Sequence, residues 1–144
     1  WTIPAEHMKR SKAHVVPLSD AAVAVLAKAD AFKVEGAEVV FSGATGKAMS
    51  DMTLLKVLRD MQEPFHVHGF RSAFTDWAAN AGFHNAVVEA ALAHKTPDAV
   101  QAAYRRTTYL GTKEDPGMRV KLMDAWGAYC SGAVTVKEAL SAAD

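Results

Sequence analysis

The sequence comprises 144 residues with a mass of 15.4 kDa, and half of it is hydrophobic, which suits one domain with a packed core. No apolar run approaches the ~20 residues of a membrane span, no signal peptide is visible, and the single Cys130 excludes an internal disulfide, as in proteins of a reducing cytosol. Sixteen basic and sixteen acidic side chains give a formal charge of zero, which argues mildly against a nucleic-acid-binding domain because such domains are usually basic.

The first part of the chain predicts a β-hairpin, a helix and an extended segment. Residues 1–4 and 14–17 have the pattern of two paired strands, and the basic stretch Lys9–Lys12 lies at or near their turn. Helical periodicity covers Asp20–Ala31. The short apolar run Glu38–Phe41 then predicts a strand or an extended segment.

The rest of the pattern is helical. Apolar residues recur at i, i+3, i+4 and i+7, most clearly over Phe70–Ala81, and Gly82 predicts the end of that helix. The other predicted helices cover Leu54–Met61, Val87–Ala93, a segment that starts near Pro97, and Met118–Cys130. The sequence therefore predicts a mainly α fold with a small antiparallel β-sheet, in the α+β class.

The motif His68-Gly69-Phe70-Arg71 lies at the start of the clearest helix. Residues three apart on a helix are neighbours on one face, and a helix N-terminus carries free N–H groups and a partial positive charge. Arg71 adds a planar fork of donors that suits two phosphate oxygens. The motif predicts an anion site, although an exposed arginine and a capping histidine would give the same spacing.

Three further residues, Lys9, His94 and Tyr104, have side chains suited to phosphodiester chemistry. A tyrosine hydroxyl, with a pKa near ~10, becomes a useful nucleophile only beside cations and a proton acceptor. A lysine on a hairpin can donate a proton to a leaving oxygen. Taken singly, each residue also fits an ordinary role as a turn lysine, a helix-capping histidine or a packed tyrosine.

Taken together, these residues and the text around them resemble the tyrosine recombinases, the phage-integrase family. The shared order is a lysine on a hairpin, His-x-x-Arg on an amphipathic helix, Leu-x-His, and a tyrosine ten residues later. The resemblance covers roughly residues 1–130 and points to integrases of satellite phages and genomic islands. The matching segments are Trp1–Lys9, His14–Ser19, His68–Arg71, Ala90–His94 and Ala102–Tyr104.

The resemblance implies a catalytic role for each residue. Tyr104 attacks the scissile phosphate to form a 3′-phosphotyrosyl link, and Lys9 protonates the departing 5′ oxygen. Arg71 and His94 stabilise the non-bridging oxygens, and His68 binds the phosphate or accepts the tyrosine proton. Phosphoryl transfer depends mainly on placement and charge stabilisation, so neither a metal nor another cofactor is expected.

The implied partner is double-stranded DNA at the attachment sites of a prophage or genomic island, which the enzyme would integrate and excise. Basic residues near the catalytic positions are the candidate DNA contacts, because lysine and arginine neutralise phosphates. These candidates are Arg10, Lys12, Lys95, Arg105 and Arg106.

One residue of the family's catalytic set is absent. The family uses a second arginine upstream of the lysine hairpin, but the eight residues before Lys9 contain none, and Arg10 on the hairpin itself is a poor substitute. The chain also begins with Trp1 rather than Met. We therefore expect a piece of a longer enzyme, in which residues 1–131 form the C-terminal part of the catalytic domain. Losing a transition-state donor lowers rates by ~10²–10³, so this piece alone is expected to be inactive or nearly so.

Residues 132–144 are expected to form a C-terminal tail. By the resemblance, such a tail packs on a neighbouring protomer and links the active sites of a homotetramer on DNA. Packing of the tail within its own chain fits its apolar residues equally well. The resemblance also implies a bacterial cytoplasmic protein without membrane partners, associated with the nucleoid when it acts.

Two other functions compete with the recombinase hypothesis. A metal-dependent hydrolase would use the histidines, yet the sequence contains no His-Glu-x-x-His motif and no cysteine pair, and no carboxylate is spaced to complete a ligand set. A catalytically dead DNA-binding or assembly module would keep the fold without the chemistry. The presence of all five remaining catalytic residue types argues against such decay.

Overall fold

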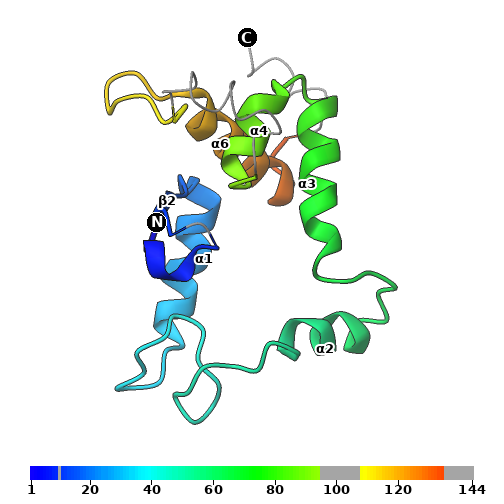
Figure 1. Cartoon of the computed structure of the whole chain (residues 1–144). Helices are drawn as coiled ribbons and strands as arrows, with labels where there is room; N and C mark the ends of the chain where they lie inside the picture. The colour runs from blue at the N-terminus through cyan, green and yellow to red at the C-terminus, as the bar shows by residue number, and fades with distance from the viewer. Residues whose placement is uncertain (10, 95–107, 135–144) are drawn as a thin grey trace. The chain divides into compact units, whose positions relative to one another are not determined.

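The computed structural model describes residues 1–9, 11–94 and 108–134, which are mostly helical (Figure 1). The described elements are β1 (Thr2–Ile3), the short 3-10 helix η1 (Ala5–His7), β2 (His14–Val15), α1 (Asp20–Ala31), α2 (Thr53–Asp60), α3 (Gly69–Asn80), α4 (Asn85–Ala91) and α6 (Met118–Cys130). The sheet has two antiparallel strands in the order β1-β2. The expectation of a mainly α fold with a small antiparallel sheet is confirmed.

The chain forms two compact units. The first unit contains Trp1–Ala21 together with the described residues from Thr75 onward, and the second unit contains Ala22–Phe74. Two helices, α1 and α3, contribute residues to both units. Among the described residues, no helix is long and apolar enough to cross a bilayer.

The predicted hairpin is present in the first unit. Thr2 pairs with Val15 and Ile3 with His14. The Val16 amide donates to the Trp1 carbonyl at 2.7 Å, which continues the pairing to the first residue. The segment between the strands begins with η1 and carries the basic residues at its far end.

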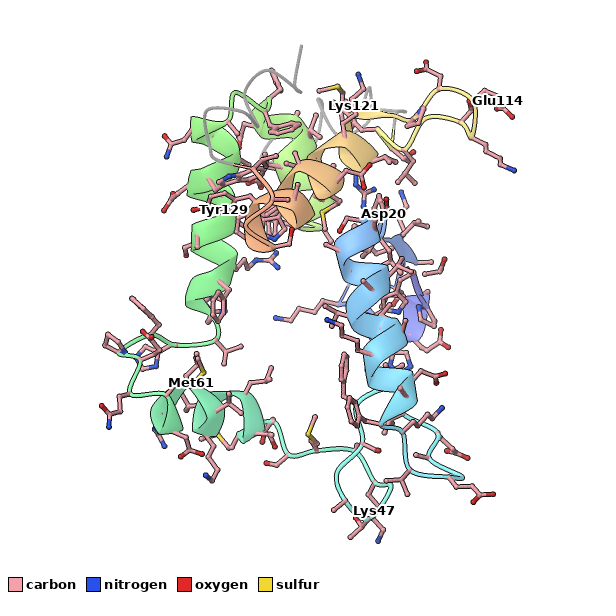
Figure 2. All side chains as sticks on the ribbon, turned by 180° about the vertical axis from the view of Figure 1, so that it is seen from behind. Asp20, Lys47, Met61, Glu114, Lys121 and Tyr129 are labelled. Atoms are coloured by element: carbon pink, nitrogen blue, oxygen red, sulfur yellow. The ribbon has the colours of Figure 1, made fainter. Side chains whose placement is uncertain are left out.

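The core of the first unit lies where α3, α4 and α6 meet, and α4 packs against α6 (Figure 1). The Trp77 ring of α3 contacts the rings of Trp126 at 5.0 Å, Tyr129 at 5.6 Å and Phe83 at 6.0 Å, measured between centroids. Figure 2 shows Tyr129 on α6 beside α3. The other buried apolar residues of this core are Ala78, Ala81, Ala86, Val87, Val88 and Leu122. Aromatic pairs at these separations add to the free energy gained by burial.

Of the two structures expected over Glu38–Phe41, a strand or an extended segment, the strand does not form, and residues 39–41 form a bend. The nearest pairing is an isolated antiparallel bridge between Ser42 and Ala48, across a loop in which Gly46 has a φ of +76°. Val40 and Phe41 remain 49% and 52% exposed. A short apolar run becomes a strand only when a neighbouring strand can satisfy its backbone groups, and no such strand lies among the described residues.

Each predicted helix among the described residues agrees with the structure to within two residues at both ends. Capping explains some of these small shifts. α4 begins at Asn85 because the His84 ring nitrogen Nδ1 accepts a hydrogen bond from the Ala86 amide at 3.1 Å. Gly82 follows α3 with a φ of +77°, as expected for a residue that ends a helix. The helix expected from Pro97 lies outside the described residues.

Candidate active site

Lys9 lies in a tight turn of the first unit. The Met8 amide donates to Ala5 O at 3.1 Å, and the Ser11 amide donates to Met8 O at 3.0 Å. Ser11 adopts a φ of +48°, so the chain reverses sharply after Lys9. Lys9 and Lys12 are both exposed, which presents two ammonium groups at the turn. The hairpin thus gives the predicted lysine a defined backbone position and a solvent-facing side chain.

His68 and Arg71 lie at the start of α3, in the second unit, and both are exposed. The His66 and His68 carbonyls accept from the amides of Gly69 at 2.9 Å and Arg71 at 3.1 Å. These tight turns engage first-turn N–H groups that were expected to be free. Positive potential at this end of the helix therefore comes mainly from the Arg71 guanidinium and the helix dipole.

His94 follows α4 through a left-handed residue, Ala93, whose φ is +54°. Its amide donates to Glu89 O at 3.0 Å, and its ring nitrogen Nδ1 lies 3.0 Å from Glu89 Oε2. The carboxylate fixes the orientation of the exposed ring. A histidine held by a carboxylate at one nitrogen presents a defined tautomer at the other.

The loop before α6 is built on close backbone contacts. Gly111 and Pro116 form an isolated bridge, and the Gly117 amide donates to Leu110 O at 3.0 Å. Gly111 has a φ of +70°, and a Cβ on it would lie 2.2 Å from Asp115 O, so only glycine fits. Glu114 lies at the tip of this loop (Figure 2). These contacts therefore fix the path of the chain from Tyr109 to the start of α6.

The sequence did not predict a polar pair formed by the buried Arg119 and the partly buried His14. Arg119, on α6, is 4% exposed; its guanidinium donates to Val15 O through Nη2 and to Thr108 O at 3.3 Å through Nη1. The His14 ring nitrogen Nε2 lies 3.1 Å from Ala91 O and 3.5 Å from Arg119 Nη2. Since a carbonyl can only accept, the shorter contact places the proton on Nε2.

The surroundings of this pair shift both pKa values. Burial lowers the pKa of Arg119. Burial also lowers the pKa of His14, the nearby Arg119 charge lowers it further, and the hydrogen bond to Ala91 O opposes the shift. The pair is therefore a neutral ring beside a buried cation.

A helical pattern could have identified Arg119. Positions 119, 122, 126 and 130 share one face of α6, so the arginine lies in the middle of an apolar stripe. An arginine in such a stripe must bury its guanidinium or displace its neighbours. No comparable signal marks His14, whose partners lie 77 and 105 residues away in the sequence.

Five predicted site residues lie outside the described residues, namely Arg10, Lys95, Tyr104, Arg105 and Arg106. Lys9 and His94 belong to the first unit, whereas His68 and Arg71 belong to the second. Convergence of these side chains on a single phosphate stays a prediction.

The described residues offer little for the rival chemistries. They contain no group of three or more histidine, cysteine or carboxylate side chains able to hold a metal ion. Desolvation raises the pKa of the Cys130 thiol, which makes it a poorer nucleophile at neutral pH. A shallow hollow in the second unit, lined by residues 35–39 and 45–48, contains none of the predicted catalytic residues.

Known proteins are similar to this chain over most of its length. The model of the phage integrase family matches residues 1–110. Prophage integrase IntA of Escherichia coli K12 is 35% identical over 114 residues, which cover 76% of this chain and 27% of the relative. Prophage integrase IntS of the same strain is 30% identical over 124 residues, and the integrase of Shigella phage Sf6 is 29% identical over the same length. Each of these two alignments covers 79% of this chain and 31% of the relative.

No solved structure matches the chain significantly. The chain spans 27–31% of the length of the curated relatives. The region matched by the family model includes the positions of Lys9, the His-x-x-Arg motif, His94 and Tyr104. The chain therefore belongs to the phage integrase family, whose members are tyrosine recombinases.

Proposed function

We propose that the protein to which this chain belongs carries out site-specific DNA recombination, integrating and excising a prophage or genomic island. The observation that carries the proposal is the family match over residues 1–110, which includes five residues suited to the reaction. The exposed position of Lys9, His68, Arg71 and His94 supports the proposal, because a duplex can approach side chains only on the surface.

In the proposed reaction, the Tyr104 hydroxyl oxygen attacks the scissile phosphorus, and His68 accepts its proton or binds the phosphate. The bond between phosphorus and the 5′ oxygen breaks, and Lys9 supplies the proton that this oxygen takes up. Arg71 and His94 donate to the non-bridging oxygens while phosphorus is five-coordinate. The 3′-phosphotyrosyl bond conserves the energy of the diester, so a second strand can reverse the step without ATP.

The proposed DNA contacts are Arg10, Lys12, Lys95, Arg105 and Arg106, which lie close in sequence to Lys9, His94 and Tyr104. Lysine and arginine side chains neutralise phosphates, so DNA affinity should fall steeply with salt concentration. We further propose that the protein acts in the bacterial cytoplasm on nucleoid DNA, as a homotetramer linked by residues 132–144.

A suicide DNA substrate tests the proposal. A nick close to the cleavage site lets the short 5′ product diffuse away, so that a phosphotyrosyl adduct accumulates. The DNA comes from the junctions of the element that encodes the protein, and the parent protein that carries this chain is used. We expect a covalent adduct that resists denaturation, and mass spectrometry should locate it on Tyr104.

The chain has three tyrosines, which allows a matched set of variants. Tyr104→Phe should abolish the adduct, whereas Tyr109→Phe and Tyr129→Phe, which remove the same hydroxyl elsewhere, should retain it. An adduct that survives Tyr104→Phe but is lost in another variant would assign the nucleophile elsewhere. Specific binding without any adduct would favour the catalytically dead binding module.

The 144-residue chain alone provides a second comparison. Because no arginine precedes Lys9, we propose that the chain alone forms the adduct at least ~10²-fold more slowly than the parent. A comparable rate would mean that the missing arginine is dispensable or that another residue replaces it.

A further inference from the structure

The guanidinium of Arg119 joins segments that are far apart in the sequence. From α6, it donates to Val15 O at the end of the hairpin and to Thr108 O in the segment that follows Tyr104. The Arg119 amide also donates to Tyr109 O at 2.9 Å, so backbone and side chain hold the same segment. One buried side chain therefore connects the hairpin, residues 108–109 and α6.

His14 extends these connections to a fourth segment. It belongs to β2, and its Nε2 donates to Ala91 O at the last residue of α4. Arg119 Nη2 approaches the same ring at 3.5 Å. The hairpin is thus bonded to the end of α4 on one side and to α6 on the other.

The bonded atoms lie close in sequence to three of the predicted catalytic residues. Lys9 precedes His14 by five residues, His94 follows Ala91 by three, and Tyr104 precedes Thr108 by four. All these contacts lie within the first unit. Arg119 itself is too deeply buried to contact a duplex, so its effect on the reaction must act through these segments.

We propose that Arg119 is a positioning residue, an inference that rests on the recombinase function proposed above. It holds the hairpin that carries Lys9 in a fixed position relative to the segment that precedes His94 and the segment that follows Tyr104. The acceptors are backbone carbonyls, and no carboxylate pairs with Arg119 among the described residues. A buried charge is costly unless its donors are satisfied. The Arg119 Nε–H is buried without a partner among the described residues, so Nη1 and Nη2 provide the compensating hydrogen bonds. The carbonyls of Val15 and Thr108 are therefore held where the guanidinium needs them.

The consequence for catalysis falls on proton transfer. Lys9 must reach the 5′ oxygen as its bond to phosphorus breaks, and a displacement of about 1 Å caused by a distant change can lower a rate ~10²-fold. Loss of the Arg119 donors frees the hairpin from α6. Lys9 would then protonate the leaving oxygen less often, while Arg71 and His94 would still donate to the non-bridging oxygens.

A change of leaving group tests this assignment. Arg119→Met keeps most of the apolar stem and removes the donors. It is compared with the unaltered parent protein on two suicide substrates, one with the normal 5′ oxygen and one with sulfur in its place. A thiol has a pKa near ~8.5, so a thiolate leaves without a proton from Lys9.

We expect Arg119→Met to lower single-turnover cleavage of the oxygen substrate ~10²-fold, with DNA affinity changed by no more than about twofold. On the sulfur substrate the deficit should shrink to about tenfold or less, because general-acid help is no longer needed. Lys9→Ala should show the same rescue. Arg71→Ala should not, since its guanidinium acts on the non-bridging oxygens. Equal deficits of Arg119→Met on both substrates would overturn the proposal.

Hydrogen exchange on the 144-residue chain gives a readout that needs no DNA. Arg119→Met should speed exchange of the Val16 amide and of peptides covering residues 1–18, while peptides covering residues 77–88 keep their protection. Uniformly faster exchange in both regions would mean that Arg119 merely supports the core, and the assignment would fail. His14→Gln, which keeps a donor near Ala91 O, should give a smaller change confined to the hairpin and residues 89–94.

The two readouts separate failure of this proposal from failure of the recombinase function. If the unaltered parent forms no adduct with either substrate, the recombinase proposal fails, and hydrogen exchange alone decides whether Arg119 holds the hairpin. If the parent cleaves DNA and Arg119→Met cleaves both substrates normally, only the positioning role is lost.

Discussion

The imidazole of His14 links the hairpin to the end of α4 and lies beside Arg119. It donates to Ala91 O while a permanent cation lies 3.5 Å from the same nitrogen. A second proton would place two positive charges side by side in partly buried surroundings. Burial is the main cause that lowers the pKa of His14; the Arg119 charge adds to the shift, and the hydrogen bond to Ala91 O opposes it.

This lowered pKa makes stability depend on pH. His14 titrates below its ordinary value of 6.5 when folded, so between those two pKa values the unfolded chain binds more protons. The contribution of His14 is fully present above about pH 6.5 and is lost as the pH falls through the folded pKa. Because the ring is only partly buried, we expect a loss of about 0.5 kcal/mol or less.

Urea denaturation at a series of pH values checks this prediction. The free energy of unfolding should decline as the pH falls below about 6.5, and His14→Gln should have a shallower decline than the unaltered chain. His7→Gln serves as the matched control, because that histidine is exposed on the same hairpin. Identical slopes for His14→Gln and the unaltered chain would contradict a role for this ring.

At the residue scale, the sequence is more informative about candidate reactive residues than about which polar residues are buried. Lys9, His68, Arg71 and His94 are exposed polar residues whose types and order point to phosphate chemistry without any knowledge of contacts. The roles of His14 and Arg119 depend on partners about a hundred residues apart, which local patterns cannot reveal. The arginine within the apolar stripe of α6 is the partial exception.

At the scale of elements, the spacing of apolar residues together with the residues that begin and end helices predicted the helices well. The expected bounds of α1 and α6 are those of the structure. A strand or an extended segment was expected over residues 38–41, and no strand formed because a strand requires a partner, whereas a helix satisfies its own backbone hydrogen bonds. Local pattern is therefore sufficient for these helices and insufficient for isolated strands.

The packing of α6 against the start of α1 depends on one glycine. A Cβ on Gly127 would lie 2.2 Å from Ser19 Oγ and 2.7 Å from Ser19 Cβ, and Ser19 is 6% exposed. Gly127→Ala should therefore destabilise the chain by roughly 1–2 kcal/mol, because overpacking outweighs the ~1 kcal/mol gain in helix propensity. Thermal and chemical unfolding measure the change.

Gly69→Ala is the matched control for that substitution. Gly69 is the first residue of α3, and a Cβ on it would meet nothing within 4 Å, so its replacement should be neutral or slightly stabilising. The double variant Ser19→Gly with Gly127→Ala should lose less stability than the sum of the single changes, since the clash is relieved. A stabilised Gly127→Ala would show that the two helices can move apart freely.

For the whole molecule, the division into two units separates the predicted catalytic set. Lys9 and His94 lie in the first unit, and His68 and Arg71 in the second, with α1 and α3 running through both. The sequence names these residues but contains no local signal for their convergence, which depends on long-range packing and on bound DNA. The family match covers these positions and leaves both their roles and their assembly to experiment.

The proposed homotetramer depends on the C-terminal tail. Helix α6 ends at Cys130 and Gly132 follows with a φ of +72°, so removal of residues 133–144 keeps the helix and costs it one cap, the hydrogen bond from the Ala133 amide to Ala128 O. If the tail packs on a neighbouring protomer, its deletion should weaken self-association on DNA about tenfold or more, because each lost contact is repeated around the assembly. DNA binding by a single protomer should stay within about twofold, because the candidate phosphate contacts all precede residue 133.

Sedimentation of the parent protein on attachment-site DNA, with and without residues 133–144, measures the effect. Replacement of Val134, Val136 and Leu140 by serine in an intact tail distinguishes apolar docking from mere tail length, because it removes about 1.5–3 kcal/mol of burial per side chain that docks. If both variants assemble like the unaltered protein, the tail packs within its own chain and another surface must join the protomers. If deletion alone weakens assembly, polar or backbone contacts of the tail provide the link.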